Sequence, residues 1–392
     1  MNIIFFSNPD FFGSQKRPAF SSMPRFTNML AEGMEQRGHK VSIWSPGSQF
    51  FKLPVKGVVK KYMGYIDQYF LFPLDVKRRL KECPDDTLFV FTDQAQGPWI
   101  PLVSKRNHVM HCHDFLAQWS ALGLIEENKV SWTGRKYQRY IRNGYDLCKN
   151  FISGSYKTNY DLQKLTSTKS IALNVVYNGL DQMYQPVNTA KGKLGLANKI
   201  GVDLSQGYFL HVGGNQWYKN RKGVLELYVA WRKQYGNNLP LIMIGADPSA
   251  EIYEVLVGTP FKNDVHFISG LSDAYVRYAY SGATAFLFPS FAEGFGWPIA
   301  EAMGCGCPVV TTNEAPMTEV AGDAAFLLDK KTAENETHWA SDGAKTLQKI
   351  FELTTEERVE VVQRSLENVK RFDADVALNK IESIYTKILV GV

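Results

Sequence analysis

Short apolar runs alternate with amphipathic helical patterns along nearly the whole chain. Residues 3–6 form the first run, and Phe26, Leu30 and Met34 then recur at helical spacing. Strands that alternate with helices are typical of a parallel sheet covered on both faces. The sequence therefore predicts a doubly wound α/β fold. The predicted strands are 3–6, 41–44, 88–91, 108–112, 151–153, 208–212, 241–244, 265–268, 285–288, 309–311 and 325–328.

The length of 392 residues exceeds what one hydrophobic core supports, because cores seldom grow beyond roughly 250–300 residues. We therefore expect two Rossmann-like domains, at residues 1–185 and 186–373. The polar stretch 185–205 is interpreted as the linker between them. An amphipathic helix at 374–392 follows the second domain.

The composition narrows the class of protein. A hydrophobic content of 45% excludes a largely disordered chain, and no apolar run approaches the roughly 20 residues of a membrane helix. The first residues have no basic segment of the kind that opens a signal peptide. Five cysteines without a C-x-x-C pair argue against a disulfide framework or a structural zinc site. We expect a cytoplasmic protein.

Positive charge is concentrated in the first half of the chain. Residues 1–185 contain 24 Lys+Arg and 15 Asp+Glu, a net of +9, so that the remainder carries −4 of the total of +5. This pattern fits nucleic acid, an anionic membrane surface, a phosphorylated ligand, or simply a solvated basic surface. Residues 50–65 mix lysines with apolar and aromatic side chains. We therefore hypothesise that the first domain touches an anionic membrane, peripherally and on its inner face.

Polar clusters follow three predicted strands, at 111–114, 215–221 and 289–301. Ligands of open α/β sheets bind beyond the carboxyl ends of the strands. Two such domains that face each other would bring these clusters to one interdomain cleft. The sequence therefore predicts a binding site there.

The cluster at 289–301 carries the most information. Gly294 and Gly296 permit a tight loop, and Pro298 suits the first turn of a helix, predicted to span 298–303. The start of this helix is a potential anion site. Glu301, one turn inside, could accept both hydroxyls of a vicinal diol, and Glu293 lies on the loop ahead. Alternatively, Glu301 only compensates the helix dipole and Glu293 is solvated.

The other two clusters offer cations and a histidine. Lys219 and Arg221 suit neutralisation of a diphosphate, although a run of basic residues is more often solvent-exposed. His113 and Asp114 could be a metal pair, but no further ligand follows at suitable spacing, and His113 could instead be structural. We expect no metal and no cofactor.

The stretch from Phe288 to Val310, FPSFAEGFGWPIAEAMGCGCPVV, resembles the signature of glycosyltransferase family 4, the retaining GT-B enzymes. Its Glu-x₇-Glu block, formed by Glu293 and Glu301, is highly specific. Residues 264–273 before it and 319–325 after it agree with this resemblance, as does the N-G-x-D segment at 178–181.

The resemblance implies a GT-B fold of two Rossmann-like domains, with the final helix crossing back to the first domain. It implies an acceptor-binding first domain and a nucleotide-sugar donor held by the second. Glu301 would take the ribose diol, Glu293 the donor sugar and Lys219 the diphosphate. The implied contacts from the rest of the chain are the amides of Gly294, Phe295 and Gly296, His113 facing the donor sugar, and Gly13 on a loop over the phosphates.

One departure from the family is visible. Its members usually carry an arginine at the position of Gly214 or of Tyr218, and Arg221 is the candidate replacement.

The expected reaction moves a hexose, with retention of anomeric configuration, onto a glycan or lipid-linked acceptor in polysaccharide or envelope glycan synthesis. The alternatives are a glycoside hydrolase that uses the carboxylate pair and a basic nucleic-acid-binding protein. A nicotinamide oxidoreductase lacks its G-x-G-x-x-G motif here. Because the binding-protein alternative leaves the Glu-x₇-Glu loop unexplained, we expect no nucleic-acid partner.

Overall fold

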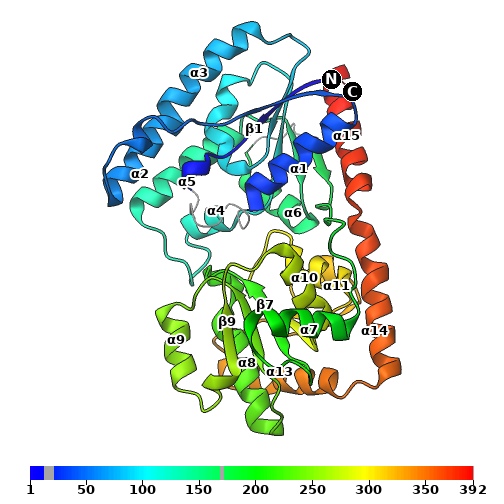
Figure 1. Ribbon diagram of the computed structural model, residues 1–392. Helices are drawn as coiled ribbons and strands as arrows, with labels where there is room; N and C mark the ends of the chain where they lie inside the picture. Colours follow the sequence, from blue (N-terminus) through cyan, green and yellow to red (C-terminus); the bar gives the residue numbers. More distant parts are fainter. Residues whose placement is uncertain (13–21, 168–171, 392) are drawn as a thin grey trace. The chain divides into compact units, whose positions relative to one another are not determined.

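The computed structural model describes residues 1–12, 22–167 and 172–391. The chain divides into two compact units, Met1–Tyr177 with Asp375–Val392, and Asn178–Ala374. Within the described ranges, each unit holds one six-stranded parallel sheet with helices on both faces (Figure 1). The predicted α/β fold with two Rossmann-like domains is confirmed. No helix among these residues is long and apolar enough to cross a bilayer.

The sheet of the first unit has the strand order β2-β1-β3-β4-β5-β6. Its strands are β1 (Asn2–Phe6), β2 (Lys40–Trp44), β3 (Leu88–Phe91), β4 (His108–Cys112), β5 (Asn150–Ser153) and β6 (Ala172–Val175). Its helices are α1 (Ser22–Gln36), α2 (Gly57–Ile66), α3 (Phe72–Arg79), α4 (Leu116–Ala121), α5 (Trp132–Tyr145), α6 (Tyr156–Leu165) and α15 (Ala374–Val390). A π-helical turn, Asp67–Leu71, joins α2 to α3.

Alternate side chains of these strands pack on opposite faces of the sheet. On one face, Phe6 stacks on Phe91 at 4.5 Å between ring centroids and meets Phe72 of α3 edge-on. On the other face, His111 of β4 lies between Phe26 of α1 and Tyr385 of α15. Both faces are therefore dry, as expected for parallel strands.

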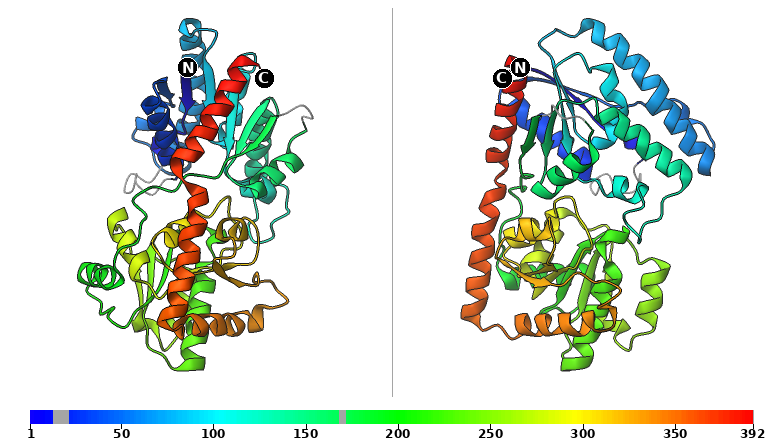
Figure 2. Two further views of the ribbon diagram at one scale, coloured as in Figure 1. Left: turned by 90° about the vertical axis from the view of Figure 1, so that its right-hand side faces the viewer. Right: turned by 180° about the vertical axis from the view of Figure 1, so that it is seen from behind.

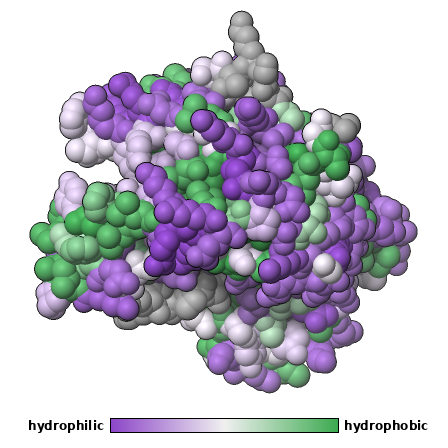
Figure 3. All heavy atoms as spheres, turned by 90° about the horizontal axis from the view of Figure 1, so that it is seen from above, coloured by the Kyte–Doolittle hydropathy of each residue, from purple (hydrophilic) through white to green (hydrophobic). Residues whose placement is uncertain are grey.

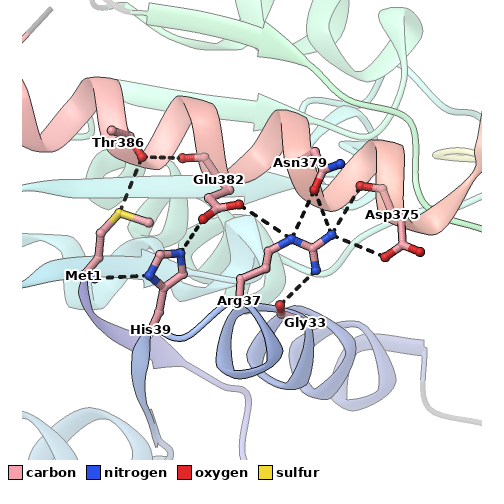
Figure 4. Close-up of polar contacts among 8 residues, drawn as sticks. All are labelled: Met1, Gly33, Arg37, His39, Asp375, Asn379, Glu382 and Thr386. Atoms are coloured by element: carbon pink, nitrogen blue, oxygen red, sulfur yellow. Dashed lines mark hydrogen bonds and ion pairs between the residues drawn. The ribbon is translucent and has the colours of Figure 1, made fainter.

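Helix α15 packs on the first unit through polar contacts with the turn between α1 and β2 (Figures 2 and 4). The Arg37 guanidinium donates to Asn379 Oδ1 at 2.9 Å and lies 3.3 Å from Asp375 Oδ1. His39 Nε2 lies 2.6 Å from Glu382 Oε1. The predicted return of the terminal helix to the first domain is confirmed.

The sheet of the second unit has the order β12-β11-β10-β7-β8-β9. Its strands are β7 (Phe209–Gly213), β8 (Leu241–Gly245), β9 (Val265–Ile268), β10 (Ala285–Phe288), β11 (Val309–Thr312) and β12 (Ala325–Leu328). Its helices are α7 (Thr189–Ile200), α8 (Arg221–Tyr235), α9 (Ala250–Val257), α10 (Asp273–Gly282), α11 (Trp297–Gly304), α12 (Met317–Ala321), α13 (Glu336–Phe351) and α14 (Thr355–Asn368). Strand order reverses between the neighbours β7 and β10, which makes the ends of these two strands the expected ligand site.

The unit boundaries lie at 177/178 and 374/375, whereas the sequence placed them after residues 185 and 373. The difference has a physical reason, because the segment after Tyr177 packs on the second unit. The Leu180 amide donates to Phe372 O at 2.7 Å, and the Tyr184 ring meets Tyr280 edge-on.

The predicted linker 185–205 is wrong, because most of it forms helix α7. This helix packs closely on α10, where a Cβ at Gly192 would lie 3.0 Å from Tyr278 O and a Cβ at Gly195 would lie 2.8 Å from the Tyr278 ring. The glycines that made the stretch look like a linker allow this close approach. The predicted strands all form, with ends shifted by at most one residue, and β6 was not predicted.

Removal of the Tyr385 hydroxyl should destabilise the first unit. Tyr385 Oη lies 2.7 Å from His111 Nε2, and both side chains are buried. Tyr385→Phe leaves that ring nitrogen without its partner, so we expect a loss of about 1–3 kcal/mol in the free energy of unfolding. Urea denaturation measures it, with Tyr253→Phe on exposed α9 as the control. Equal stability of the two variants would contradict the docking of α15.

Acid should weaken the protein through its buried histidines. Burial lowers the pKa of His111 and of His211 to about 3, against about 6.5 in an unfolded chain. The unfolded state therefore binds more protons between pH 6.5 and 3, and stability falls as the pH falls through that window. At pH 5.5 each of the two histidines lowers the free energy of unfolding by about 1.4 kcal/mol relative to neutral pH. In His211→Asn, the loss of stability between pH 7.5 and 5.5 should be smaller by that amount, and an unchanged loss would contradict the assignment.

Candidate active site

Lys219 and Glu293 form an ion pair at the switch point of the second unit. Lys219 follows β7 and Glu293 follows β10, so neighbouring strands bring together residues 74 positions apart. Lys219 Nζ donates to both carboxylate oxygens, at 2.8 and 2.9 Å. The side chains are only 15% and 7% exposed. The sequence predicted both residues as site residues, but it did not predict their contact.

Neighbouring side chains fix the position of Glu293. The Ser290 hydroxyl donates to Glu293 Oε1 at 2.8 Å, and the Ser290 carbonyl accepts from the Thr312 hydroxyl at 2.7 Å. Lys219 Nζ also lies 4.9 Å from the centre of the Phe288 ring. A charge held by this many contacts keeps one orientation, which is what a preorganised site requires.

Asn220 ties the two loops together in a conformation rare for a non-glycine residue. Its φ is +48°, in the left-handed region. Its Oδ1 caps α8 by accepting from the Gly223 amide, and its Nδ2 donates to Pro289 O at 2.9 Å. The Phe291 amide donates to Tyr218 O at 2.8 Å. Sequence reasoning missed Asn220 and Ser290, although their places beside Lys219 and Glu293 were a usable signal.

Helix α11 begins where the glycine loop ends, one residue outside the predicted span at each end. Gly296 adopts a φ of +103° at its N-cap, so this position favours glycine. Glu301 lies one turn inside and its Oε2 accepts from the Tyr280 hydroxyl at 3.2 Å. Burial, reinforced by Glu301, raises the pKa of Tyr280. The phenol therefore stays protonated and remains a donor to Glu301.

The rest of the glycine loop presents backbone. The Phe295 side chain is buried and meets Phe372 edge-on at 5.4 Å. Any contact of Phe295 with a ligand would therefore come from its backbone, and the contact that the resemblance implies stays a prediction. Gly294 lies between Phe295 and Glu293 on the same loop.

Arg221 lies at the start of α8, beside the β7 and β8 ends. It donates to Asn215 Oδ1 and to Ala246 O, and only 3% of the residue is exposed. Burial lowers its pKa to about 10. Among the described residues, Arg221 Nε and Nη2 have no hydrogen-bond partner. The same is true of Nε2 of the buried His211. Gly214 lies in the turn between β7 and these residues.

In the first unit, His113 follows β4 in a fixed orientation. Its Nε2–H donates to Thr92 O at 2.8 Å, its backbone amide donates to Gln94 Oε1, and Phe26 packs on its ring. Its predicted contact with a donor sugar stays a prediction. Gly13 lies outside the described residues, and so does its predicted loop.

Metal-ligating side chains are dispersed. Across residues 1–12, 22–167 and 172–391, no group of three His, Cys, Asp or Glu side chains is placed to hold an ion. All five cysteines are free thiols, and burial raises the pKa of Cys305 and Cys307.

Residues 196–347 match the sequence model of the family "Glycosyl transferases group 1". This segment is therefore similar to the group 1 glycosyltransferases. The matched segment contains Lys219, Glu293 and Glu301, the residues whose geometry is given above.

Two curated relatives of this chain come from bacteria. The O-antigen chain mannosyltransferase B of Escherichia coli is 34% identical over 126 residues, which cover 32% of this chain and 33% of that protein. The O-antigen chain mannosyltransferase RfbU of Salmonella typhimurium is 24% identical over 69% of each chain. The chain thus matches only a third of the length of the first relative.

Solved structures share the whole fold at low sequence identity. WaaG, a glycosyltransferase involved in lipopolysaccharide biosynthesis, has a TM-score of 0.72 at 18% identity and covers 98% of this chain and 99% of its own. HepE of Anabaena in complex with UDP-glucose has a TM-score of 0.72 at 15% identity, over 99% and 100%. The fold of this chain is GT-B, as predicted.

The Lys219–Glu293 pair should show energetic coupling. A double-mutant cycle of Lys219→Met and Glu293→Gln, measured by urea denaturation, should give a coupling free energy of about 1–3 kcal/mol. The reason is that each single change leaves the other buried charge unpaired. The exposed Lys222–Glu251 pair is the control and should give below about 0.5 kcal/mol. Equal coupling in the two cycles would contradict the buried ion pair.

Proposed function

We propose that this protein is a retaining glycosyltransferase that moves a hexose from a nucleotide-diphosphate sugar to a glycan or lipid-linked acceptor of an envelope polysaccharide. The buried Lys219–Glu293 pair at the β7–β10 switch point is the observation that supports it most. The names of the two bacterial mannosyltransferases favour a hexose donor.

The chemistry requires stabilisation of a departing diphosphate. Lys219 is one cation in reach of the strand ends, and the N-terminus of α11 offers backbone donors behind the Gly294–Gly296 loop. Charge on the leaving group would draw Lys219 away from Glu293. The Glu293 carboxylate, still held by Ser290, would then face the donor sugar. For this step we propose a front-face route through an ion-pair-like state.

Donor recognition would depend on Glu301 and the β7 end. Tyr280 holds Glu301 through Oε2, and this carboxylate would accept from a ribose diol. Arg221 would replace the arginine that the family carries at Gly214 or Tyr218, because two of its nitrogens are buried without hydrogen-bond partners in the described chain. We propose that no metal takes part.

The first unit would supply the acceptor site. His113 would orient the donor sugar from the end of β4, since its ring is held by Thr92 and Phe26. A lipid-linked acceptor would place this unit near a membrane surface.

The proposal is tested by transfer activity in two variants. A thermal-shift panel of nucleoside diphosphates and nucleotide-sugars first identifies the donor, because a ligand at 100 times its Kd stabilises by about 2.7 kcal/mol. Transfer to membrane-extracted glycan is then measured with that donor. Glu293→Gln and Lys219→Ala should each lower kcat/KM at least about 100-fold and leave the protein folded.

The matched control is Glu314→Gln, an exposed glutamate of the same unit that should keep wild-type activity. Wild-type turnover in Glu293→Gln or Lys219→Ala would contradict the site. Hydrolysis of glycan without any nucleotide-sugar would favour the hydrolase instead. The anomeric configuration of the product, read by NMR, tests retention.

A further inference from the structure

One long helix of the first unit presents an apolar stripe to solvent. Val58 and Tyr62 of α2 are 69% and 56% exposed, and Phe70 and Leu74, beyond the π turn, are 64% and 53% exposed. These four residues follow a spacing of four or eight. In an uninterrupted α-helix such a row would drift by about 40° per step, or about 160° from residue 58 to 74. The π turn Asp67–Leu71 counters this drift, since it rotates less per residue.

A short loop extends the stripe sideways. The buried carboxylate of Asp67 accepts from the amides of Phe50 and Phe51, at 2.9 and 2.8 Å. This fixes residues 50–53 against the π turn, with Phe50 and Leu53 40% and 44% exposed. The α2 surface is the exposed set Phe50, Leu53, Val58, Val59, Tyr62, Phe70 and Leu74. Figure 3, the view from above, shows hydrophobic side chains gathered at the left edge, the side of α2 in Figure 1.

Positive charge surrounds the α2 surface. Residues 50–66 contain four lysines and no acidic residue, and Lys56 and Lys61 are exposed. The Asp75 carboxylate on α3 is paired with Arg78 and Arg79. Apolar and cationic side chains are therefore exposed on the same surface. An exposed apolar patch of this kind is unusual for a surface that contacts only water.

The adjacent helix α5 has the same character. Helix α5 packs on α2 and the π turn through a tyrosine cluster. Tyr65 stacks on Tyr137 at 5.8 Å between ring centroids, and the Tyr69 hydroxyl bonds to that of Tyr137 at 2.6 Å. Residues 132–145 contain four cations and no acid, and Trp132 is 72% exposed with Lys136 Nζ over its ring. By contrast, the exposed apolar residues of α9, Tyr253 and Val257, lie among acidic ones.

We infer that the α2 surface docks on an anionic lipid bilayer. The apolar stripe would lie in the headgroup region, with lysines and arginines on both sides meeting lipid phosphates. Aromatic rings at such a depth present an apolar body and a polar tip, as Tyr62 and Trp132 do. This extends the proposed function, because a lipid-linked acceptor would lie at that bilayer, but the docking itself needs no transfer.

Flotation of the full-length protein tests the inference. Vesicles of phosphatidylcholine alone are compared with equimolar phosphatidylcholine and phosphatidylglycerol. Wild-type protein should float with the anionic vesicles at least ten times better than with the neutral ones, and 0.5 M NaCl should weaken the binding. Equal flotation with both vesicles, or none, would overturn the inference.

Two variant pairs locate the surface. Val58→Glu with Phe70→Glu, and Lys56→Glu with Lys61→Glu, should each lower the partition coefficient at least tenfold. The matched controls are Tyr253→Glu with Val257→Glu on α9, and the exposed pair Lys191→Glu with Lys233→Glu, which should float as wild type does. All of the changed residues are exposed. Circular dichroism checks that the variants fold.

Other occupants give different results. A dimer in light scattering that Val58→Glu with Phe70→Glu dissociates, without lipid dependence, would make this face an interface between copies and overturn the inference. Inorganic phosphate at 10 mM that displaces the protein as fully as 0.5 M NaCl would assign the cations to a small anion, which also overturns it. A protein that floats as expected but shows no sugar transfer would contradict the proposed reaction alone.

Discussion

A buried ion pair between loops that follow two neighbouring parallel strands organises the second unit. Lys219 and Glu293 meet because the strand order reverses between β7 and β10, which leaves both strand ends open on the same side. Asn220 and Ser290 then hold the two loops in register. Neither charge would be tolerable in so dry a place without the other, so the fold and the candidate chemistry depend on the same contact.

Much of this architecture could be predicted from the sequence, because buried parallel strands are continuous apolar runs with sharp ends. Strands such as β3, β4, β9 and β10 were predicted to the residue. The missed strand β6 is ALNV, a half-exposed edge with a polar residue. Helix α7 was missed because Gly192 and Gly195 weaken a helix pattern, and only the position of Tyr278 explains them. Tertiary packing overrode local propensity there.

The candidate site was predictable in its residues but not in its contacts. Spacing and resemblance identified Lys219, Glu293 and Glu301, since a motif records residue types. The ion pair, the Tyr280 bond to Glu301 and the left-handed Asn220 depend on which strands are neighbours, and a single sequence does not contain that information. The same holds for Arg221. Its position two residues after Lys219 did not predict that it would be buried between the ends of β7 and β8.

The place of α15 has a consequence for how the chain folds during synthesis. Residues of the first unit leave the ribosome first, yet His111 in the middle of its sheet receives its partner Tyr385 only after all of the second unit has been made. Domains ordinarily fold in order of emergence. Here the earlier domain must wait for the later one to be translated, with the part of its sheet that α15 covers still exposed. That interval is when a chaperone would have apolar surface to hold.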